Sequence, residues 1–221
     1  VLRSYRPRAL NLVLPFIPCG RQDRITSDDN AIKAFTLKHV VAEIINNCKF
    51  DRVEVTDPHS DVSTALINNV LVKTQTNCIL EHGSAFSSHD YIISPDAGAT
   101  KKALESSKAL RIPLIECSKV RDLISNEILK TNVSIDPQAL IGSTVVIFDD
   151  ILDYGTTSRE LAKVLKEEYG VKQVDLFVTH GILPINHRVN PPSRFTFPLE
   201  TIDNIYCYYL WSDDNSEVNE R

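Results

Sequence analysis

Short runs of apolar, often β-branched residues alternate along this chain with segments of helical periodicity, and this alternation limits the possible folds more than any other feature. Such runs are typical of buried strands, and the periodic segments are typical of helices that pack on a sheet. The pattern predicts the α/β class, with doubly wound, largely parallel sheets. The expected strands are 10–14, 51–57, 90–94, 112–117, 143–149, 173–181 and 204–210, and the expected helices are 31–47, 97–110, 120–129 and 158–168.

The chain has 221 residues, which is enough for one large domain or two small ones. No linker composition marks a boundary, but a division near 81–90 would separate a partial first unit from a fuller second one. We expect a partial N-terminal α/β domain at 1–82, a C-terminal domain at 83–200, and a terminal strand and tail at 201–221. Because the sequence contains no methionine and begins with Val1, we also expect its N-terminus to be incomplete.

The composition indicates which partners and compartment to expect. A net charge of −5 argues against nucleic acid or an anionic membrane as the main partner. No apolar run approaches the length of a membrane span, and no signal-peptide pattern opens the chain. The five cysteines are scattered, odd in number and without a C-x-x-C, which argues against a disulfide framework or structural zinc. We therefore expect a cytoplasmic protein.

The segment VVIFDDILDYGTT, 145–157, places two adjacent aspartates where an expected strand ends. Ligands of open parallel sheets bind at the carboxyl edge of the strands. The carboxylates of Asp149 and Asp150 accept hydrogen bonds, which suits a pair of vicinal hydroxyls or a hydrated Mg²⁺. A solvated acidic loop before a capped helix is the alternative interpretation.

The same segment continues into an expected phosphate-binding turn. The chain turns at Gly155, and Thr157 or Ser158 is a suitable residue to cap a following helix. The backbone N–H groups of a helix N-terminus, together with the helix dipole, favour an anion over 154–158. A ribose 5-phosphate, with a diol at one end and a phosphate at the other, would satisfy both parts of the segment.

The segment resembles the ribose-phosphate loop of type I phosphoribosyltransferases and, more closely, that of ribose-phosphate pyrophosphokinases. The usual form in that family is an apolar strand, two aspartates, two apolar residues and Asp-Thr-x-Gly-Thr, so Tyr154 stands here for a threonine and Thr156 for a glycine. The resemblance covers about 10–183 and includes four further motifs in the family's order: LPFIPCGRQDR, DPHSD, SPDAGATKKA and VTHGIL. No P-loop motif is present.

The resemblance implies where ATP and Mg²⁺ bind. It assigns Arg21, Gln22 and Asp23 to the nucleotide, and an arginine fork and an amide are suitable groups for phosphate and for a base or ribose. It assigns His59 to the Mg²⁺–ATP site and Asp96 to the metal as a second ligand. A histidine ligand is unusual for Mg²⁺, so a phosphate or water-mediated contact is an alternative for His59, as is a bond to loop carbonyls.

The resemblance also implies a catalytic pair and a ribose 5-phosphate site. Lys119 and Arg121 align with the family's Lys-x-Arg pair on its mobile catalytic loop, where two cations would stabilise the charge on a transferring diphosphoryl group. A surface Lys-x-Arg is the alternative interpretation. In the ribose 5-phosphate site, Asp149 and Asp150 would hold the hydroxyls, and the 5-phosphate would lie against Asp153, Tyr154, Gly155, Thr156 and Thr157.

The leading hypothesis from the sequence is an ATP-dependent diphosphotransferase that converts ribose 5-phosphate and ATP to 5-phosphoribosyl 1-pyrophosphate and AMP. By resemblance, the enzyme would need Mg²⁺ and would form a homo-oligomer. Two other hypotheses remain open. One is a catalytically weak regulatory homologue that associates with a true synthetase. The other is a phosphoribosyltransferase that consumes phosphoribosyl pyrophosphate, although such an enzyme has no use for an ATP site.

Overall fold

A computed structural model describes residues 4, 7–28, 31–81, 83–121, 128–153, 155–182 and 201–211. The chain forms two compact units, residues 1–75 and 76–221. The first unit ends seven residues before the boundary expected from the sequence, because helix α3 (Gln75–Glu81) contributes Cys78 and Ile79 to the core of the second unit. The late strand expected at 204–210 is β11 (Asn204–Trp211), and it belongs to the sheet of the second unit.

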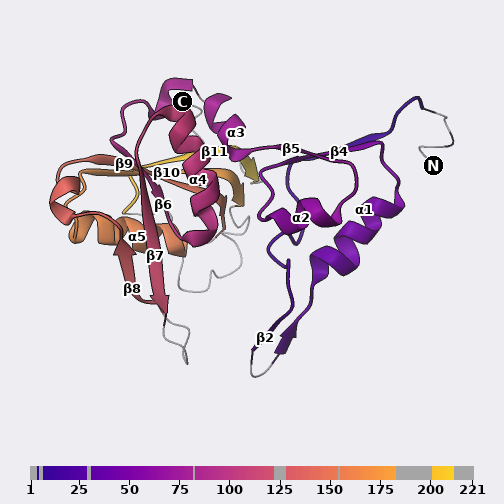
Figure 1. Cartoon of the computed structure of the whole chain (residues 1–221), viewed down its shortest axis with the longest axis horizontal. Helices are drawn as coiled ribbons and strands as arrows, with labels where there is room; N and C mark the ends of the chain where they lie inside the picture. The colour runs from indigo at the N-terminus through magenta and orange to yellow at the C-terminus, as the bar shows by residue number, and fades with distance from the viewer. Residues whose placement is uncertain are drawn as a thin grey trace, which may run out of the picture. The chain divides into compact units, whose positions relative to one another are not determined.

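The first unit is a small parallel sheet with helices on one face. Its strand order is β1-β4-β5, and Figure 1 shows α1 and α2 on the same side of β4 and β5. Val53 and Val55 of the central strand pack beneath these helices against Leu37 and Ile45. The elements of this unit are β1 (Asn11–Leu14), a π-helical turn η2 (Leu37–Ala42), α1 (Glu43–Asn47), β4 (Arg52–Thr56), α2 (Asp61–Leu66), β5 (Val70–Lys73) and an antiparallel pair, β2 (Thr26–Asp28) and β3 (Ala31–Lys33).

The second unit is built on a six-stranded sheet of order β11-β10-β9-β6-β7-β8. All neighbouring strands in it are parallel except β7 and β8, which pair antiparallel. Its strands are β6 (Tyr91–Ser94), β7 (Leu114–Arg121), β8 (Ile128–Val133), β9 (Thr144–Leu152), β10 (Gln173–Ile182) and β11. Its other elements are α3, α4 (Ala97–Leu110), α5 (Thr156–Glu167) and the short 3₁₀ turns η3 (Gly83–Phe86) and η4 (Pro137–Leu140).

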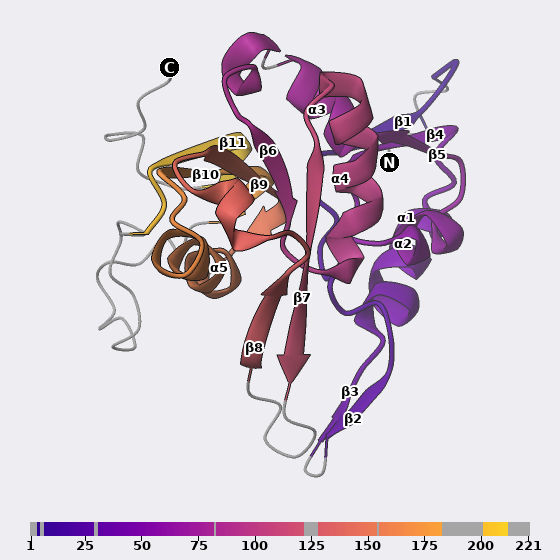
Figure 2. The ribbon, with the colours of Figure 1, turned by 60° about the vertical axis from the view of Figure 1, so that its left-hand side comes forward.

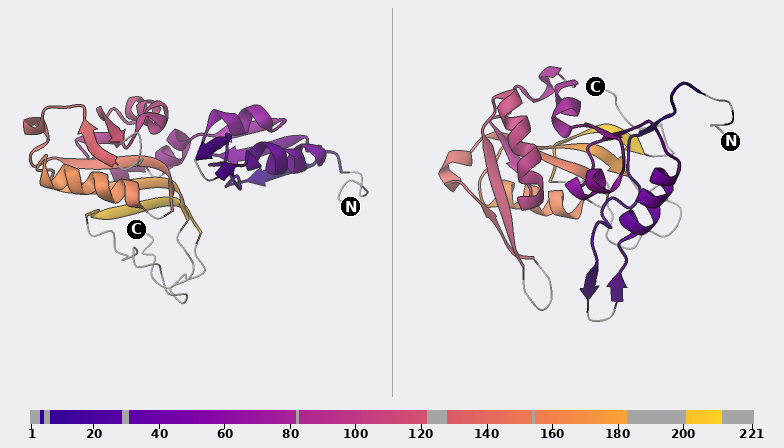
Figure 3. Two further views of the ribbon diagram at one scale, coloured as in Figure 1. Left: turned by 90° about the horizontal axis from the view of Figure 1, so that it is seen from below. Right: turned by 45° about the vertical axis from the view of Figure 1, so that its right-hand side comes forward.

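Helices cover both faces of this larger sheet, as the α/β prediction requires. Alternate side chains of a strand point to opposite faces. Val145 and Ile147 of β9 lie in a core with Leu161 of α5, whereas Val146 and Phe148 lie in a second core with Ala103 of α4. In the left panel of Figure 3, α5 and α4 accordingly lie on opposite sides of the strands. The doubly wound parallel sheet predicted from the sequence is therefore confirmed.

Two helices expected from the sequence differ in the structure. The first was expected at 31–47, but its first residues form β3 and the helical turns begin only at Leu37. Residues 31–33 match a helical period, yet their backbone forms an antiparallel pair with 26–28. The spacing of apolar residues alone does not reveal such strand pairing. The second was expected at 120–129, where β7 continues to Arg121 and β8 begins at Ile128. Figure 2 shows β7 and β8 as a long hairpin beside α4.

No helix in the described part of the chain is long and apolar enough to cross a membrane.

Candidate functional site

The two aspartates singled out in the sequence lie near the carboxyl end of β9. Asp149 and Asp150 follow four buried residues of this strand, 145–148, and both are half-buried. The backbone N–H of Asp150 donates a hydrogen bond of 2.9 Å to Oδ1 of Asp149. The chain continues through Leu152 in the strand and turns at Asp153. The pair is thus held by a central strand of the sheet and not by a loose loop.

The electrostatics of this pair are unfavourable to two full negative charges. Burial and the neighbouring carboxylate of Asp150 raise the pKa of Asp149 well above its ordinary value of 3.8, and the charge of Asp96 raises it further. A like charge at short range disfavours the ionised form of a carboxyl group. A group of this kind is suited to receive a ligand that supplies hydroxyl donors or positive charge.

Asp96 lies where β6 ends and α4 begins, at the same edge of the sheet. It is the N-cap of α4, and its Oδ1 accepts hydrogen bonds from the backbone N–H groups of Gly98 at 2.9 Å and Ala99 at 3.1 Å. One turn and a half further along α4, Nζ of Lys102 lies 4.0 Å from Oδ2 of Asp150. The second unit therefore brings together three acidic residues from two motifs, with one lysine among them.

The turn after β9 has a helix N-terminus, but its cap differs from the expected one. Gly155 is the N-cap of α5, with φ of +67° and ψ of 7°, and no side chain caps the helix. The expected caps, Thr157 and Ser158, lie inside the first turn, where Ser158 is buried and Thr157 half-buried. Glycine adopts this left-handed backbone without the steric cost that an L-residue would carry. Tyr154, expected to contact the phosphate, lies outside the described residues.

The ATP-binding segment predicted at Arg21, Gln22 and Asp23 follows β1 in the first unit. The N–H of Gln22 donates a 2.8 Å bond to the carbonyl of Cys19, which closes a tight turn. Asp23 is only 4% exposed, and Arg24 Nε donates a 3.0 Å bond to its Oδ1. Burial alone would raise the pKa of Asp23, but the nearby Ser60 hydroxyl, the hydrogen bond and charge of Arg24, and the charge of His59 hold it below its ordinary value. Asp23 is therefore the buried residue of this segment, whereas Arg21 and Gln22 are exposed.

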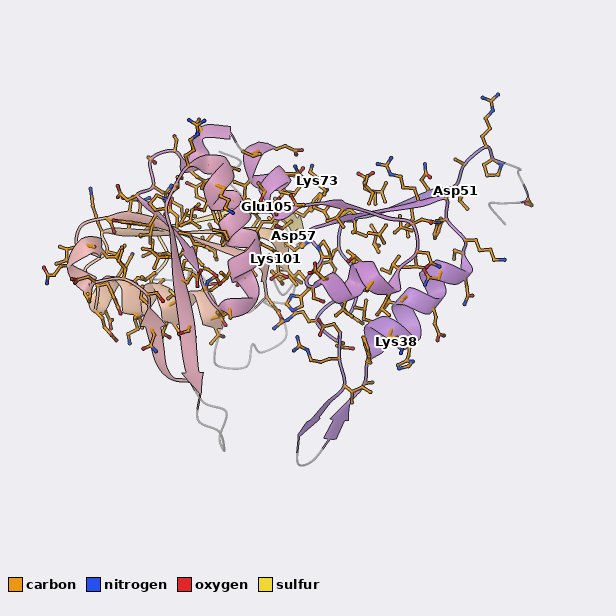
Figure 4. All side chains as sticks on the ribbon, in the orientation of Figure 1. Lys38, Asp51, Asp57, Lys73, Lys101 and Glu105 are labelled. Carbon is orange, nitrogen blue, oxygen red and sulfur yellow. The ribbon has the colours of Figure 1, made fainter. Side chains whose placement is uncertain are left out.

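The DPHSD segment follows β4 and meets that turn within the first unit. His59 lies beside Gly20, where an added Cβ would be 3.7 Å from Cβ of His59. Asp57, at the end of β4, is buried, its Oδ2 accepts a bond of 3.3 Å from Nε2 of Gln75, and its N–H donates to the carbonyl of Lys73 at 2.8 Å. Asp57 and Lys73 are labelled in Figure 4. Two motifs far apart in the sequence thus form one cluster.

The predicted catalytic pair, Lys119 and Arg121, lies on β7, whose backbone is described while their side chains are not. The resemblance had implied a loop at this position. Lys119 pairs with Thr131 of β8, and a register shift interrupts the ladder between Val120 and Arg121.

The predicted metal ligands belong to different units, His59 to the first and Asp96 to the second. Within the described residues, no group of three or more histidine, cysteine, aspartate or glutamate side chains is placed to hold a metal ion by itself. Sequence reasoning gave no role to Lys102. The only signal for Lys102 was its position in SPDAGATKKA, where Lys101 stands next to it.

The second unit has a parallel sheet with helices on both faces. At the edge of this sheet, a strand carries an acidic pair and leads through a left-handed glycine into a helix N-terminus. These features define a phosphoribosyltransferase-like α/β protein. No protein-family model matches the chain. A ribose-phosphate pyrophosphokinase of Mycobacterium leprae is 26% identical over 190 residues, which are 82% of this chain and 55% of the relative. Ribose-phosphate pyrophosphokinase 4 of Arabidopsis thaliana is 29% identical over 93% of this chain and 59% of the relative.

Among solved structures, phosphoribosylpyrophosphate synthetase from Mycobacterium smegmatis matches with a TM-score of 0.64 and 25% identity, over 79% of this chain and 54% of that one. The chain is related to the ribose-phosphate pyrophosphokinases and shares their phosphoribosyltransferase-like fold. It spans roughly half the length of the curated relatives that it matches, between 42% and 62% among the first of them.

Proposed function

We propose that this chain carries the ATP:ribose-5-phosphate diphosphotransferase activity after which its relatives are named. The C1 hydroxyl of ribose 5-phosphate would attack the β-phosphorus of ATP. The bond from that phosphorus to the α-phosphate oxygen would break, which gives 5-phosphoribosyl 1-pyrophosphate and AMP. By resemblance to the family, we also propose that the working form is a homo-oligomer.

In this proposal the ribose is held at the carboxyl end of β9. Asp149 and Asp150 accept hydrogen bonds from the two ring hydroxyls, since carboxylates act only as acceptors when ionised. The 5-phosphate lies over the first turn of α5, against Asp153 to Thr157, where the N–H groups and dipole of the helix favour an anion. The diol and the phosphate are thereby fixed at two points, which sets the position of C1.

The nucleotide is held by the cluster in the first unit. Arg21 offers a planar fork of donors to the phosphates of ATP, and Gln22 offers an amide. Asp23, buried next to them, would complete this nucleotide segment and pairs with Arg24. Lys119 and Arg121 of β7 would stabilise the charge that develops on the diphosphoryl group during transfer, because positioning and electrostatics supply most of the catalysis in such reactions.

Asp96 is chemically suited to Mg²⁺, since it is an exposed carboxylate and Mg²⁺ is commonly bound by one or two carboxylates together with phosphate oxygens. His59 would contact the ion through water or through a phosphate. A bound Mg²⁺ would reduce the negative charge on the ATP phosphates and so ease attack by a hydroxyl.

The observation that carries the proposal is the acidic pair on β9 followed directly by a left-handed glycine and the N-terminus of α5. Ribose-5-phosphate-dependent formation of AMP from Mg²⁺–ATP tests it. We expect Lys119→Ala to abolish the activity while ATP and ribose 5-phosphate still bind. Full activity in Lys119→Ala would show that the catalytic assignment is wrong.

A further inference from the structure

We propose that Lys102 is a positioning residue for recognition of the ribose hydroxyls: its ammonium group orients the carboxylate of Asp150 towards the bound sugar. This inference rests on the proposed function and adds a residue to it. Lys102 would touch Asp150 and not the substrate.

The position of Lys102 follows from how α4 is anchored. Asp96 caps the helix at its first turn through two backbone N–H groups, which fixes where the helix begins at the edge of the sheet. The helix contacts β6, β7 and β9, and Ala103, next to Lys102, is 1% exposed in the core beneath it. Lys101 and Glu105, labelled in Figure 4, are exposed on the same helix, whereas Lys102 is half-buried.

Strand periodicity explains why Asp150 and not Asp149 is the partner. Val146 and Phe148 of β9 face the core on the α4 side, and Asp150 continues that alternation. Its Oδ2 lies 4.0 Å from Nζ of Lys102, with 12% of the Asp150 side chain and 26% of the Lys102 side chain exposed. Solvent screens such a pair less than it screens a surface pair.

A carboxylate that recognises a diol must keep one orientation, because a hydrogen bond weakens steeply as its angle departs from linear. Asp149 is oriented by the N–H of Asp150. Lys102 orients the carboxylate of Asp150 in a similar way, through the ion pair on the α4 side of the strand. Its positive charge also offsets the repulsion between the two adjacent carboxylates.

The test uses the full chain and isothermal calorimetry with two probes. Ribose 5-phosphate carries both hydroxyls, whereas 2,3-dideoxyribose 5-phosphate keeps the phosphate and lacks them. The variants are Lys102→Ala, Lys102→Arg, Asp150→Asn and the double variant Lys102→Ala/Asp150→Asn. Lys108→Ala is the matched control, since Lys108 is an exposed lysine on the same helix.

We expect Lys102→Ala to weaken ribose 5-phosphate binding by roughly tenfold and dideoxyribose 5-phosphate binding by less than about twofold, the size of one misplaced charge-assisted hydrogen bond. Lys102→Arg should restore most of the affinity, and the double variant should bind no more weakly than Asp150→Asn alone. Equal loss for both probes, or no loss, would overturn the role of Lys102 while leaving the proposed function in place. Failure of the unaltered chain to bind ribose 5-phosphate would overturn both.

Discussion

The N–H of Asp150 donates a 2.9 Å hydrogen bond to Oδ1 of Asp149, so two neighbouring carboxylates are fixed together at the end of a central strand. Burial and the charges of Asp150 and Asp96 raise the pKa of Asp149, which shows that this arrangement opposes ionisation. Groups held in an electrostatically unfavourable arrangement are typical of binding sites, where a ligand relieves the cost. This relationship leads to the first prediction.

Asp149→Asn should stabilise the protein at neutral pH and impair ribose 5-phosphate binding. A carboxyl group whose pKa is raised by folding binds more protons when folded, so its ionisation destabilises the fold as pH rises from 3.8 through the raised value. The amide of asparagine does not ionise. We therefore expect the free energy of unfolding to rise by roughly 1 kcal/mol at pH 7, which corresponds to about 2–4 °C in Tm.

Thermal unfolding at several pH values measures this effect. The difference in Tm between Asp149→Asn and the unaltered chain should shrink as the pH approaches 3.8, with Glu105→Gln on α4 as an exposed control. A gain in Tm that is the same at all pH values would contradict the electrostatic explanation.

The second prediction concerns a buried polar network at the amino end of the same sheet. Asp175 is 1% exposed and accepts bonds from His89 at 2.9 Å, from Asn204 at 2.9 Å and from Gln173 at 3.0 Å. Burial by itself would raise its pKa, but these bonds hold the pKa below its ordinary value. Asp175→Ala should lower the free energy of unfolding by about 3–5 kcal/mol, because it leaves the buried hydrogen-bond partners of Asp175 unsatisfied.

Chemical denaturation at pH 7 and again well below pH 3.8, the ordinary pKa of the carboxyl group, would measure the loss. A lowered carboxyl pKa contributes stability above the unfolded value and loses it as pH falls through the folded value, so the cost should be smaller at acid pH. The affinity for ribose 5-phosphate should stay unchanged in a milder variant, Gln173→Ala, since the network lies at the opposite end of the strands from Asp149. A weaker affinity in that variant would contradict the separation of the two regions.

Gly155 gives a third prediction, for the phosphate end of the site. Its φ of +67° is a conformation that an L-residue adopts only at a cost, so Gly155→Ala should destabilise the chain by roughly 1 kcal/mol. Gly155→Asn should cost less, because asparagine tolerates the left-handed region better. Both stability and the affinity for ribose 5-phosphate should follow the order Gly, Asn, Ala. An alanine variant equal to the unaltered chain in both would show that the turn does not depend on this backbone conformation.

A fourth prediction separates the nucleotide site from the ribose site. Arg21→Ala should weaken ATP binding by at least about tenfold, as expected for loss of a bidentate contact to phosphate. It should leave the Tm and the affinity for ribose 5-phosphate unchanged, because Arg21 is exposed in the first unit and carries no core packing. Arg52→Ala is the control, since Arg52 pairs with Glu54 on the surface of β4. Equal effects of the two substitutions on ATP would contradict the assignment.

The parts of the fold that were predictable from the sequence are those in which local pattern and tertiary environment agree. β9 and β10 are buried on both faces, so their apolar runs identify them, and α4 occupies Ala97–Leu110 as its period indicates. The β7–β8 hairpin was missed because it depends on pairing of Cys117 with Val133, which no local period records.

Local sequence patterns also identified only part of the candidate site. Asp149 and Asp150 could be found from a motif, because their neighbours in the sequence are also their neighbours in the site. Lys102 could not be distinguished from Lys101 in that way, since the choice depends on how α4 is rotated against β9. Gly155 was expected as a turn residue, but its role as the N-cap depends on the backbone angle that the structure shows.

The most direct test of the central claim is to incubate the full chain with ATP, ribose 5-phosphate and Mg²⁺ and to quantify the nucleotide and sugar products. We predict AMP and 5-phosphoribosyl 1-pyrophosphate in equal amounts, with both absent when ribose 5-phosphate is omitted and when the metal is removed by a chelator. ATP binding without turnover would contradict the account and favour a regulatory role. Consumption of added phosphoribosyl pyrophosphate with a nucleobase, without AMP formed from ATP, would contradict it in favour of a phosphoribosyltransferase.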